Sequence, residues 1–193
     1  MNTLSTAIRP ALSVFVLLTA LTGVAYPLLV TGVAQAAFPA AANGSLVVAG
    51  GKPVASSLIG QSFSAHGRFW SRPSATGPMP DNGLASGGAN LGADNPALLD
   101  AVKARVEALR AADPGNTAPI PVDLVTASGS GLDPEISLAA AYYQAPRIAC
   151  ERKLGLAAVN QLIAQHAQRP WLGVIGEPRV NVLALNLALD AAR

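Results

Sequence analysis

The chain has 193 residues, enough for one ordinary domain and a membrane anchor. Hydrophobic residues make up 51% of it and charged residues only 12%, about half the usual share of charge. The net charge of +2, the two histidines and the single cysteine give no basis for a nucleic-acid surface, a zinc site or a disulfide framework, so we expect none of these.

An uncharged N-terminal segment comes first along the chain. No Asp, Glu, Lys or Arg occurs between Arg9 and Lys52. The apolar run over 11–33 is long enough to cross a bilayer as a helix of about 34 Å. Gly23 and Pro27 inside it are typical of a membrane helix that packs against other helices. We predict a short cytoplasmic N-terminus (1–10), a transmembrane helix (11–33) and a soluble domain (34–193).

A cleaved signal peptide is the alternative interpretation of this segment. Arg9 would form its basic region, residues 12–25 its apolar region, and 34–36 (AQA) its cleavage site. The apolar run continues through Val30, which is too long for a signal peptide and favours an anchor. Both interpretations carry the domain across the membrane, and the positive charge of Arg9 predicts that the N-terminus stays inside.

The rest of the chain predicts a mixed α/β domain. Gly50-Gly51 suggests a hairpin turn between 46–48 and 53–54, and residues 71–95 indicate a long loop. Asn95-Pro96 starts a helix that ends before residues 113–115. The further elements that we expect are a strand at 122–126, helices at 137–144 and 147–154 separated by Pro146 and ended by Gly155, a helix at 156–168, a strand at 179–182 and a helix at 183–192.

Motifs of catalysis are absent from the sequence. It has no G-x-x-x-x-G-K-[ST] loop, no S-x-x-K, no G-x-S-x-G and no Asp-Lys-Thr-Gly-Thr phosphorylation motif. A Ser–His–Asp site would have to use His66 or His166, which are better explained as structural residues. The turn at 128–131 (SGSG) could offer backbone N–H groups to an anion, but an ordinary loop explains it better. The residues alone indicate a non-catalytic, membrane-anchored domain.

Several strings together are far more specific than any single motif. In this order and over essentially the whole chain, the sequence resembles the C subunit of the bacterial Kdp potassium-transporting ATPase. The strings are 23–28 (GVAYPL), 58–61 (LIGQ), 69–75 (FWSRPSA), 86–91 (SGGANL), 121–134 (PVDLVTASGSGLDP), 176–183 (GEPRVNVL) and 185–190 (LNLALD).

The resemblance implies an accessory, non-catalytic subunit of a high-affinity potassium pump in the bacterial inner membrane, with its domain in the periplasm. The implied partners are a channel-like A subunit, a P-type ATPase B subunit, a single-helix F subunit and the lipid bilayer. ATP and potassium would be handled by the complex, with no cofactor, metal or catalytic residue in this chain. A membrane-anchored periplasmic enzyme is the alternative from another class.

Two mechanisms are open within the family. One is a cap that stabilises the channel-like subunit; the other is a catalytic chaperone that raises the ATP affinity of the B subunit. Gly23 and Pro27 are expected in a helix interface. The candidate subunit or nucleotide contacts are Arg72, Ser128, Gly129, Asp133, Gln144 and Arg147. Glu135, Ala89 and residues 150–153 depart from the family pattern, which weakens any ligand role for those side chains.

Overall fold

A computed structural model describes residues 3–170 and 172–192. The chain divides into two units between Ser56 and Ser57. The first unit holds a long helix and a hairpin, and the second holds the hydrophobic core and all the polar site residues predicted outside the helix.

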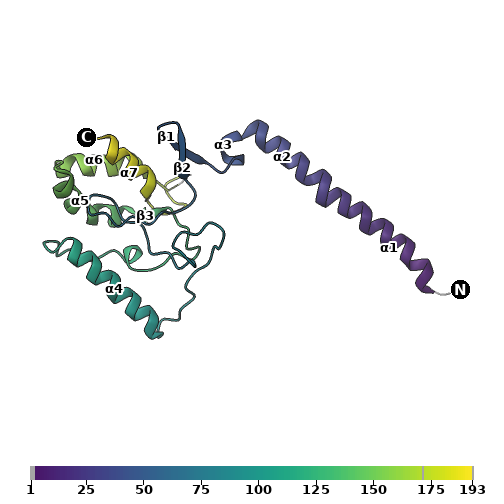
Figure 1. Ribbon diagram of the computed structural model, residues 1–193, viewed down its shortest axis with the longest axis horizontal. Helices are drawn as coiled ribbons and strands as arrows, with labels where there is room; N and C mark the ends of the chain where they lie inside the picture. Colours follow the sequence, from purple (N-terminus) through teal and green to yellow (C-terminus); the bar gives the residue numbers. More distant parts are fainter. Residues whose placement is uncertain (1–2, 171, 193) are drawn as a thin grey trace. The chain divides into compact units, whose positions relative to one another are not determined.

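One long helix dominates the first unit (Figure 1). It consists of α1 (Thr3–Ala20), a π-helical turn η1 (Leu21–Ala25) and α2 (Tyr26–Ala37). The part from Thr6 to Ala37, 32 residues, is long and apolar enough to cross a membrane, and the most apolar stretch within it is not buried inside the chain. The predicted span 11–33 lies within this helix, which confirms the helix; the crossing itself stays a prediction.

The π-helical turn lies directly before Pro27. The Tyr26 N–H donates to the carbonyl of Leu21, five residues earlier, instead of to the usual carbonyl four residues earlier. Proline lacks an N–H and its ring crowds the carbonyl four positions back, which here belongs to Gly23. A single wider turn relieves this crowding without ending the helix.

A short helix and a hairpin complete the first unit. After α3 (Pro39–Ala42), the strands β1 (Leu46–Ala49) and β2 (Lys52–Ser56) pair antiparallel, with a bulge between Val47 and Val48. The turn is Gly50-Gly51, with φ of 59° and 77°, which confirms the predicted hairpin.

The second unit is built on a small antiparallel sheet. Its order is β3-β5-β4, with β3 at Glu135–Ser137, β5 at Arg179–Asn181 and β4 at Ala167–Gln168. Ile136 lies opposite Val180 in the β3–β5 pair, and both side chains are buried. Each strand has two or three residues, so helices must supply most of the core.

Three helices provide that core: α5 (Leu138–Arg152), α6 (Leu156–His166) and α7 (Val182–Ala191). Figure 1 shows them gathered together, with α5 packed on α6 and α6 on α7. Their buried side chains include Ile148, Val159, Ile163, Leu185 and Leu189, and Phe69 joins them from the long loop. The domain is thus a mixed helix-and-sheet fold, as predicted.

Helix α4 (Pro96–Ala112) lies apart from this group (Figure 1). Asn95 caps it as predicted, because its Oδ1 accepts a hydrogen bond of 2.9 Å from Ala97 N. Of the α4 residues, all of which the structure describes, only Leu109 is buried. Before it, residues 57–95 form neither helix nor strand, in agreement with the predicted loop over 71–95.

The predicted strand at 122–126 is wrong. Val122–Leu124 forms a single 3₁₀ turn, η2. The Asp123 carboxylate accepts hydrogen bonds from Ser137 N (2.7 Å) and Ser137 Oγ (3.1 Å), which ties this segment to the start of α5. The alternation of apolar residues that suggested a strand therefore reflects one buried side chain, Leu124, rather than a pairing edge.

The predicted break at Pro146 is also wrong, since α5 runs through it as one helix. Pro146 is on the exposed side of α5, where water can satisfy the carbonyl that it leaves unpaired, and Ala145 and Ile148 around it are buried. The helix ends at Arg152, with Lys153 (φ 55°) as its C-cap, and Gly155 instead precedes α6 as its N-cap. Strands β3 and β4 were not predicted, because strands this short carry no periodic pattern.

Candidate functional site

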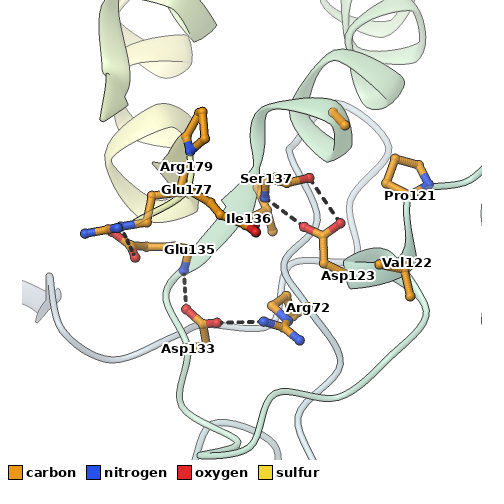
Figure 2. A pocket seen from close by; sticks show the side chains of 12 residues that line it. Arg72, Pro121, Val122, Asp123, Asp133, Glu135, Ile136, Ser137, Glu177 and Arg179 are labelled. Atoms are coloured by element: carbon orange, nitrogen blue, oxygen red, sulfur yellow. Dashed lines mark hydrogen bonds and ion pairs between the residues drawn. The ribbon is translucent and has the colours of Figure 1, made fainter. Parts of the chain in front are cut away.

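Three of the sequence strings converge on one cavity of about 420 Å³ in the second unit (Figure 2). Arg72 comes from the long loop, residues 121–123 from the η2 segment, 133–139 from β3 and its flanks, and 177–179 from the start of β5. Arg72 and residues 177–179 are far in sequence from the other two segments, and the sheet brings 133–139 and 177–179 together because β3 and β5 are neighbours.

Two ion pairs line this cavity. Arg72 Nη1 contacts Asp133 Oδ2 at 3.0 Å, and Arg179 Nε contacts Glu135 Oε2 at 2.7 Å. The other oxygen of Asp133 accepts from Glu135 N at 3.0 Å, so one carboxylate orients both the arginine and the first residue of β3. All four side chains are partly exposed, and each pair contributes at most about 1 kcal/mol to stability. Figure 2 shows the Asp133 carboxylate beside Arg72 and the Glu135 carboxylate beside Arg179.

Carboxylates outnumber guanidinium groups around the cavity. Asp123, Asp133, Glu135 and Glu177 face only Arg72 and Arg179. Glu177 is exposed and has no hydrogen bond or ion pair among the described residues. This surplus of negative charge favours a cationic group over an anion at the cavity.

A nucleophile with a base is not assembled here. Ser137 Oγ donates to Asp123 and accepts from Ala140 N at 3.0 Å, so it serves as the N-cap of α5. The residues that line the cavity include no histidine or cysteine. The described part of the chain contains no group of three or more metal-ligating side chains either.

Ser128 and Gly129 lie in a turn that packs against the 86–88 string. Ser128 Oγ accepts from Gly131 N at 2.8 Å, and Gly87 N donates to Ser130 O at 2.8 Å. A Cβ at Gly88 would lie 2.9 Å from the Gly129 carbonyl oxygen, so the two strings touch backbone to backbone. The Gly131 N–H that an anion would need is therefore used inside the turn.

Gln144 lies in the interior, 1% exposed. Its Oε1 accepts from Trp70 N at 2.7 Å, and its Nε2 donates to Trp70 O at 3.1 Å and to Ala140 O at 3.2 Å. Arg147 Nη2 adds a hydrogen bond of 2.9 Å to the same Oε1. All of these hydrogen bonds join the Gln144 side chain to other groups of the same domain.

Arg147 is 5% exposed and holds the loop that precedes Trp70. Its guanidinium donates to the carbonyls of His66 and Arg68, and it stacks on the Trp70 ring at 4.7 Å. Burial lowers the pKa of Arg147, while the charge of Asp113 acts in the opposite direction. An arginine stays charged even when its pKa is lowered. The carbonyls of His66 and Arg68 therefore replace water as partners of the charged guanidinium.

Gln144 and Arg147 form a clamp on the loop at residues 66–70. Sequence reasoning missed two residues of α7 that belong to the same clamp. Asn186 in α7 is fully buried; its Oδ1 accepts from Phe69 N at 2.9 Å and its Nδ2 donates to Phe69 O at 3.0 Å. Asp190 in α7 forms ion pairs of 2.8 Å with Arg68 and with Arg152. The polar positions 186 and 190, four apart in an otherwise apolar helix, were the available signal.

The electrostatics of Asp190 follow from these pairs. Partial burial acts to raise the pKa of its carboxyl, but the hydrogen bond from Arg152 and the charge of Arg68 outweigh it, so the pKa lies below its usual value. The carboxylate therefore stays ionised and links α7 both to the loop and to α5.

Four of the predicted site residues thus form two separate pairs. The structure brings Arg72 together with Asp133 and Gln144 together with Arg147, and no hydrogen bond or ion pair joins one pair to the other in the described chain. Gly23 and Pro27 belong to the first unit, where both are exposed on the helix. A Cβ at Gly23 would meet only Thr19 Cγ2, at 4.0 Å.

Comparison with known proteins gives a consistent result over the full chain. A family model described as KdpC, the K⁺-transporting ATPase c chain, matches residues 8–191. The potassium-transporting ATPase KdpC subunit of Polaromonas naphthalenivorans is 68% identical over 186 residues, covering 96% of this chain and 95% of its own. The proteins of the same name from Variovorax paradoxus and Methylibium petroleiphilum are 66% and 64% identical, each covering 98% of this chain and 98% and 100% of their own lengths. The chain therefore belongs to the KdpC family, the c chain of K⁺-transporting ATPases.

Proposed function

We propose that this chain is a non-catalytic accessory subunit, needed for assembly and stability of a potassium-transporting ATPase in the bacterial inner membrane. The observation that carries the proposal is the apolar helix Thr6–Ala37, whose most apolar stretch is not buried within the chain. An uncovered apolar surface of this length is stable only in lipid or against other membrane helices. The partners are a channel-like A subunit, a P-type ATPase B subunit and a small F subunit.

The second unit acts as a rigid domain rather than as a site of chemistry. Gln144 and Arg147 are committed to backbone partners in the loop at 66–70, and Ser137 is committed to capping α5. The cavity around Arg72 and Asp133 carries surplus negative charge without a nucleophile, which suits contact with a basic group of a partner subunit.

Orientation follows from the charges beside the helix. Arg9 precedes the apolar segment, and Lys52 is the first charged residue after it. The N-terminus is then cytoplasmic and the second unit periplasmic. A periplasmic domain caps the channel-like subunit and has no access to cytoplasmic ATP, which disfavours the catalytic-chaperone mechanism.

Sidedness of the second unit is the first test. Protease added to intact spheroplasts should digest it, with a cytoplasmic protein surviving as control. If digestion requires permeabilisation while a periplasmic control is cut, the orientation is reversed and the ATP-chaperone mechanism takes its place. Turnover of any substrate by the purified chain would instead favour the anchored enzyme.

A second test addresses the helix interface. Gly23→Leu places a large side chain at the π-helical turn and should reduce co-purification of the other subunits in mild detergent at least several-fold. Gly32→Leu is the matched control, because Gly32 lies in the same helix but outside the π-helical turn. Equal recovery of the complex with both variants would overturn the interface at Gly23.

A further inference from the structure

Another cavity of the second unit, of about 470 Å³, lies where the C-terminal end of α4 meets α5. It is lined by Arg110 from the last turn of α4, by residues of the following loop at 113–120, and by Tyr143 from α5. None of these residues lines the cavity around Arg72. The two cavities are therefore separate sites in the same domain.

Tyr143 brings to this cavity a hydroxyl group that has no partner. The residue is only 8% exposed, and its Oη is buried without a hydrogen bond to any described residue. Buried hydroxyl groups in folded proteins are nearly always paired, because an unpaired one loses its hydrogen bonds to water without replacement. The unpaired hydroxyl thus indicates that the cavity takes a group with an accepting oxygen.

The cavity carries one charge of each sign. The guanidinium of Arg110 is exposed and forms no ion pair or side-chain hydrogen bond within the described chain. Burial and the charge of Asp113 raise the pKa of Tyr143. The charges of Arg110 and Arg147 act on that pKa in the opposite direction, so both charges of the cavity lie near the phenol. The hydroxyl remains protonated at neutral pH and can donate.

Asn116 fixes the acidic wall of the cavity in place. Its Nδ2 donates to Asp113 Oδ2 at 3.2 Å and to the backbone carbonyl of Tyr143 at 2.9 Å. Its Oδ1 accepts from Ala118 N at 3.1 Å. These bonds hold the Asp113 carboxylate against α5 and leave its Oδ1 without a side-chain partner among the described residues. The exposed side chain of Arg110 can still move to admit a ligand.

We propose that this cavity binds a small zwitterion of the α-amino acid class. The carboxylate of the ligand accepts hydrogen bonds from Arg110 and from the Tyr143 hydroxyl, and its ammonium group donates to Oδ1 of Asp113. An anion alone would leave the charge of Asp113 unpaired, and a cation alone would leave Arg110 and Tyr143 without an acceptor. The volume falls in the range of about 300–1,000 Å³ that is typical of small-molecule sites.

The test is thermal unfolding of the full chain in detergent, followed by circular dichroism, with L-alanine as the probe. Propionate and ethylamine are the matched compounds, because each keeps only one of the two charged groups of alanine. L-Alanine at about 20 mM should raise the melting temperature by about 2 °C or more. Propionate and ethylamine at the same concentration should each give less than half of that shift. The site needs neither the membrane crossing nor the other subunits, so this test is independent of the proposed function.

Tyr143→Phe tests the role of the hydroxyl and should abolish the shift with L-alanine. Its matched control is Tyr142→Phe, which should keep the full shift, because Tyr142 is the neighbouring residue of α5, is 41% exposed and does not line the cavity. Without ligand, Tyr143→Phe should melt at the same temperature as wild type or higher, since it removes an unpaired buried hydroxyl.

Four results would each overturn the proposal. The first is the absence of a shift with L-alanine. The second is an equal shift in Tyr143→Phe, which would show that the solute stabilises the protein without the site. The third is an equal shift with propionate or ethylamine, which would exclude a zwitterion. The fourth is a lower melting temperature of ligand-free Tyr143→Phe, which would show that the hydroxyl already has a partner inside the domain.

Discussion

Gln144 and Trp70 exchange two hydrogen bonds, with the side-chain amide of Gln144 pairing to both the N–H and the carbonyl of Trp70. A neighbouring β-strand would accept from the N–H and donate to the carbonyl of Trp70 in the same way, but here both partners belong to a side chain of helix α5. Asn186 makes the same exchange with Phe69 from a second helix. Two consecutive residues of a loop are thus paired from α5 and α7, which explains how a loop without regular structure can contribute Phe69 to the core.

Gln144→Ala should destabilise the domain by about 2–4 kcal/mol, because it leaves the N–H and carbonyl of Trp70 unpaired in the interior. Urea unfolding followed by tryptophan fluorescence measures the loss, since Trp70 is itself in the clamp. Gln161→Ala, on the exposed side of α6, is the matched control and should change stability by less than about 0.5 kcal/mol. A Gln144→Ala protein of normal stability that lowers the ATP affinity of the complex would show a nucleotide role instead.

Gln144→Ala and Asn186→Ala together should cost less than the sum of the two single changes. The clamps hold adjacent residues, so opening one frees the loop and removes part of what the other stabilises. A double-mutant cycle should give a coupling energy of about 1 kcal/mol or more. Additivity within about 0.3 kcal/mol would mean that Phe69 and Trp70 are held independently.

Asp190→Asn should lower stability by about 1 kcal/mol at pH 7, through loss of its ion pairs with Arg68 and Arg152. The folded-state pKa of Asp190 lies below its unfolded value. Its contribution is therefore present in full above the unfolded pKa, about 3.9, and is lost as the pH falls through the folded pKa. The difference in unfolding free energy between wild type and Asp190→Asn should therefore become smaller below pH 4. The control Asp100→Asn, on the exposed face of α4, should have the same unfolding free energy as wild type at pH 7.

Gly60→Ala should destabilise the wall of the charged cavity by about 1–3 kcal/mol. A Cβ there would lie 2.8 Å from the Asp133 carbonyl oxygen, and Gly60 N also donates to Leu132 O at 2.8 Å. Backbone cannot move aside as a flexible side chain can, so the 131–133 segment must shift and disturb the Arg72–Asp133 pair. Thermal unfolding compares it with Gly83→Ala, which has open space at its Cβ position; equal melting temperatures for the two variants would contradict the close approach.

Local signals in the sequence predicted the elements that depend on them. Asn95-Pro96 marked the start of α4, and Gly50-Gly51 marked the hairpin, because capping and positive φ are properties of a few adjacent residues. The predicted helix break at Pro146 was wrong, because the burial of Ala145 and Ile148 stabilises the helix by more than one missing hydrogen bond costs. The predicted strand at 122–126 was wrong, because the conformation of this segment depends on the hydrogen bond from Ser137 N to the Asp123 carboxylate, 14 residues away.

For the site too, residues close together in sequence were easier to predict as partners than residues far apart in sequence. Arg72 and Asp133 were both named from the sequence, but they are 61 positions apart and their pairing follows from how β3 is placed. Gln144 and Arg147 were also both named from the sequence; they are three positions apart on α5, and the structure joins them. Asn186 and Asp190 were not singled out, because their partners Phe69 and Arg68 are 117 and 122 residues away.

The π-helical turn at Leu21–Ala25 has a consequence for how the long helix meets its neighbours. One extra residue in a turn offsets everything after it by about 100° around the helix axis. Side chains before Leu21 and after Tyr26 that a regular 3.6-residue period would align therefore point in different directions. A neighbour that follows the stripe of α1 lies beside a different stripe on α2, so the two halves of this helix can serve two different partners, or one helix that crosses from one stripe to the other near Gly23.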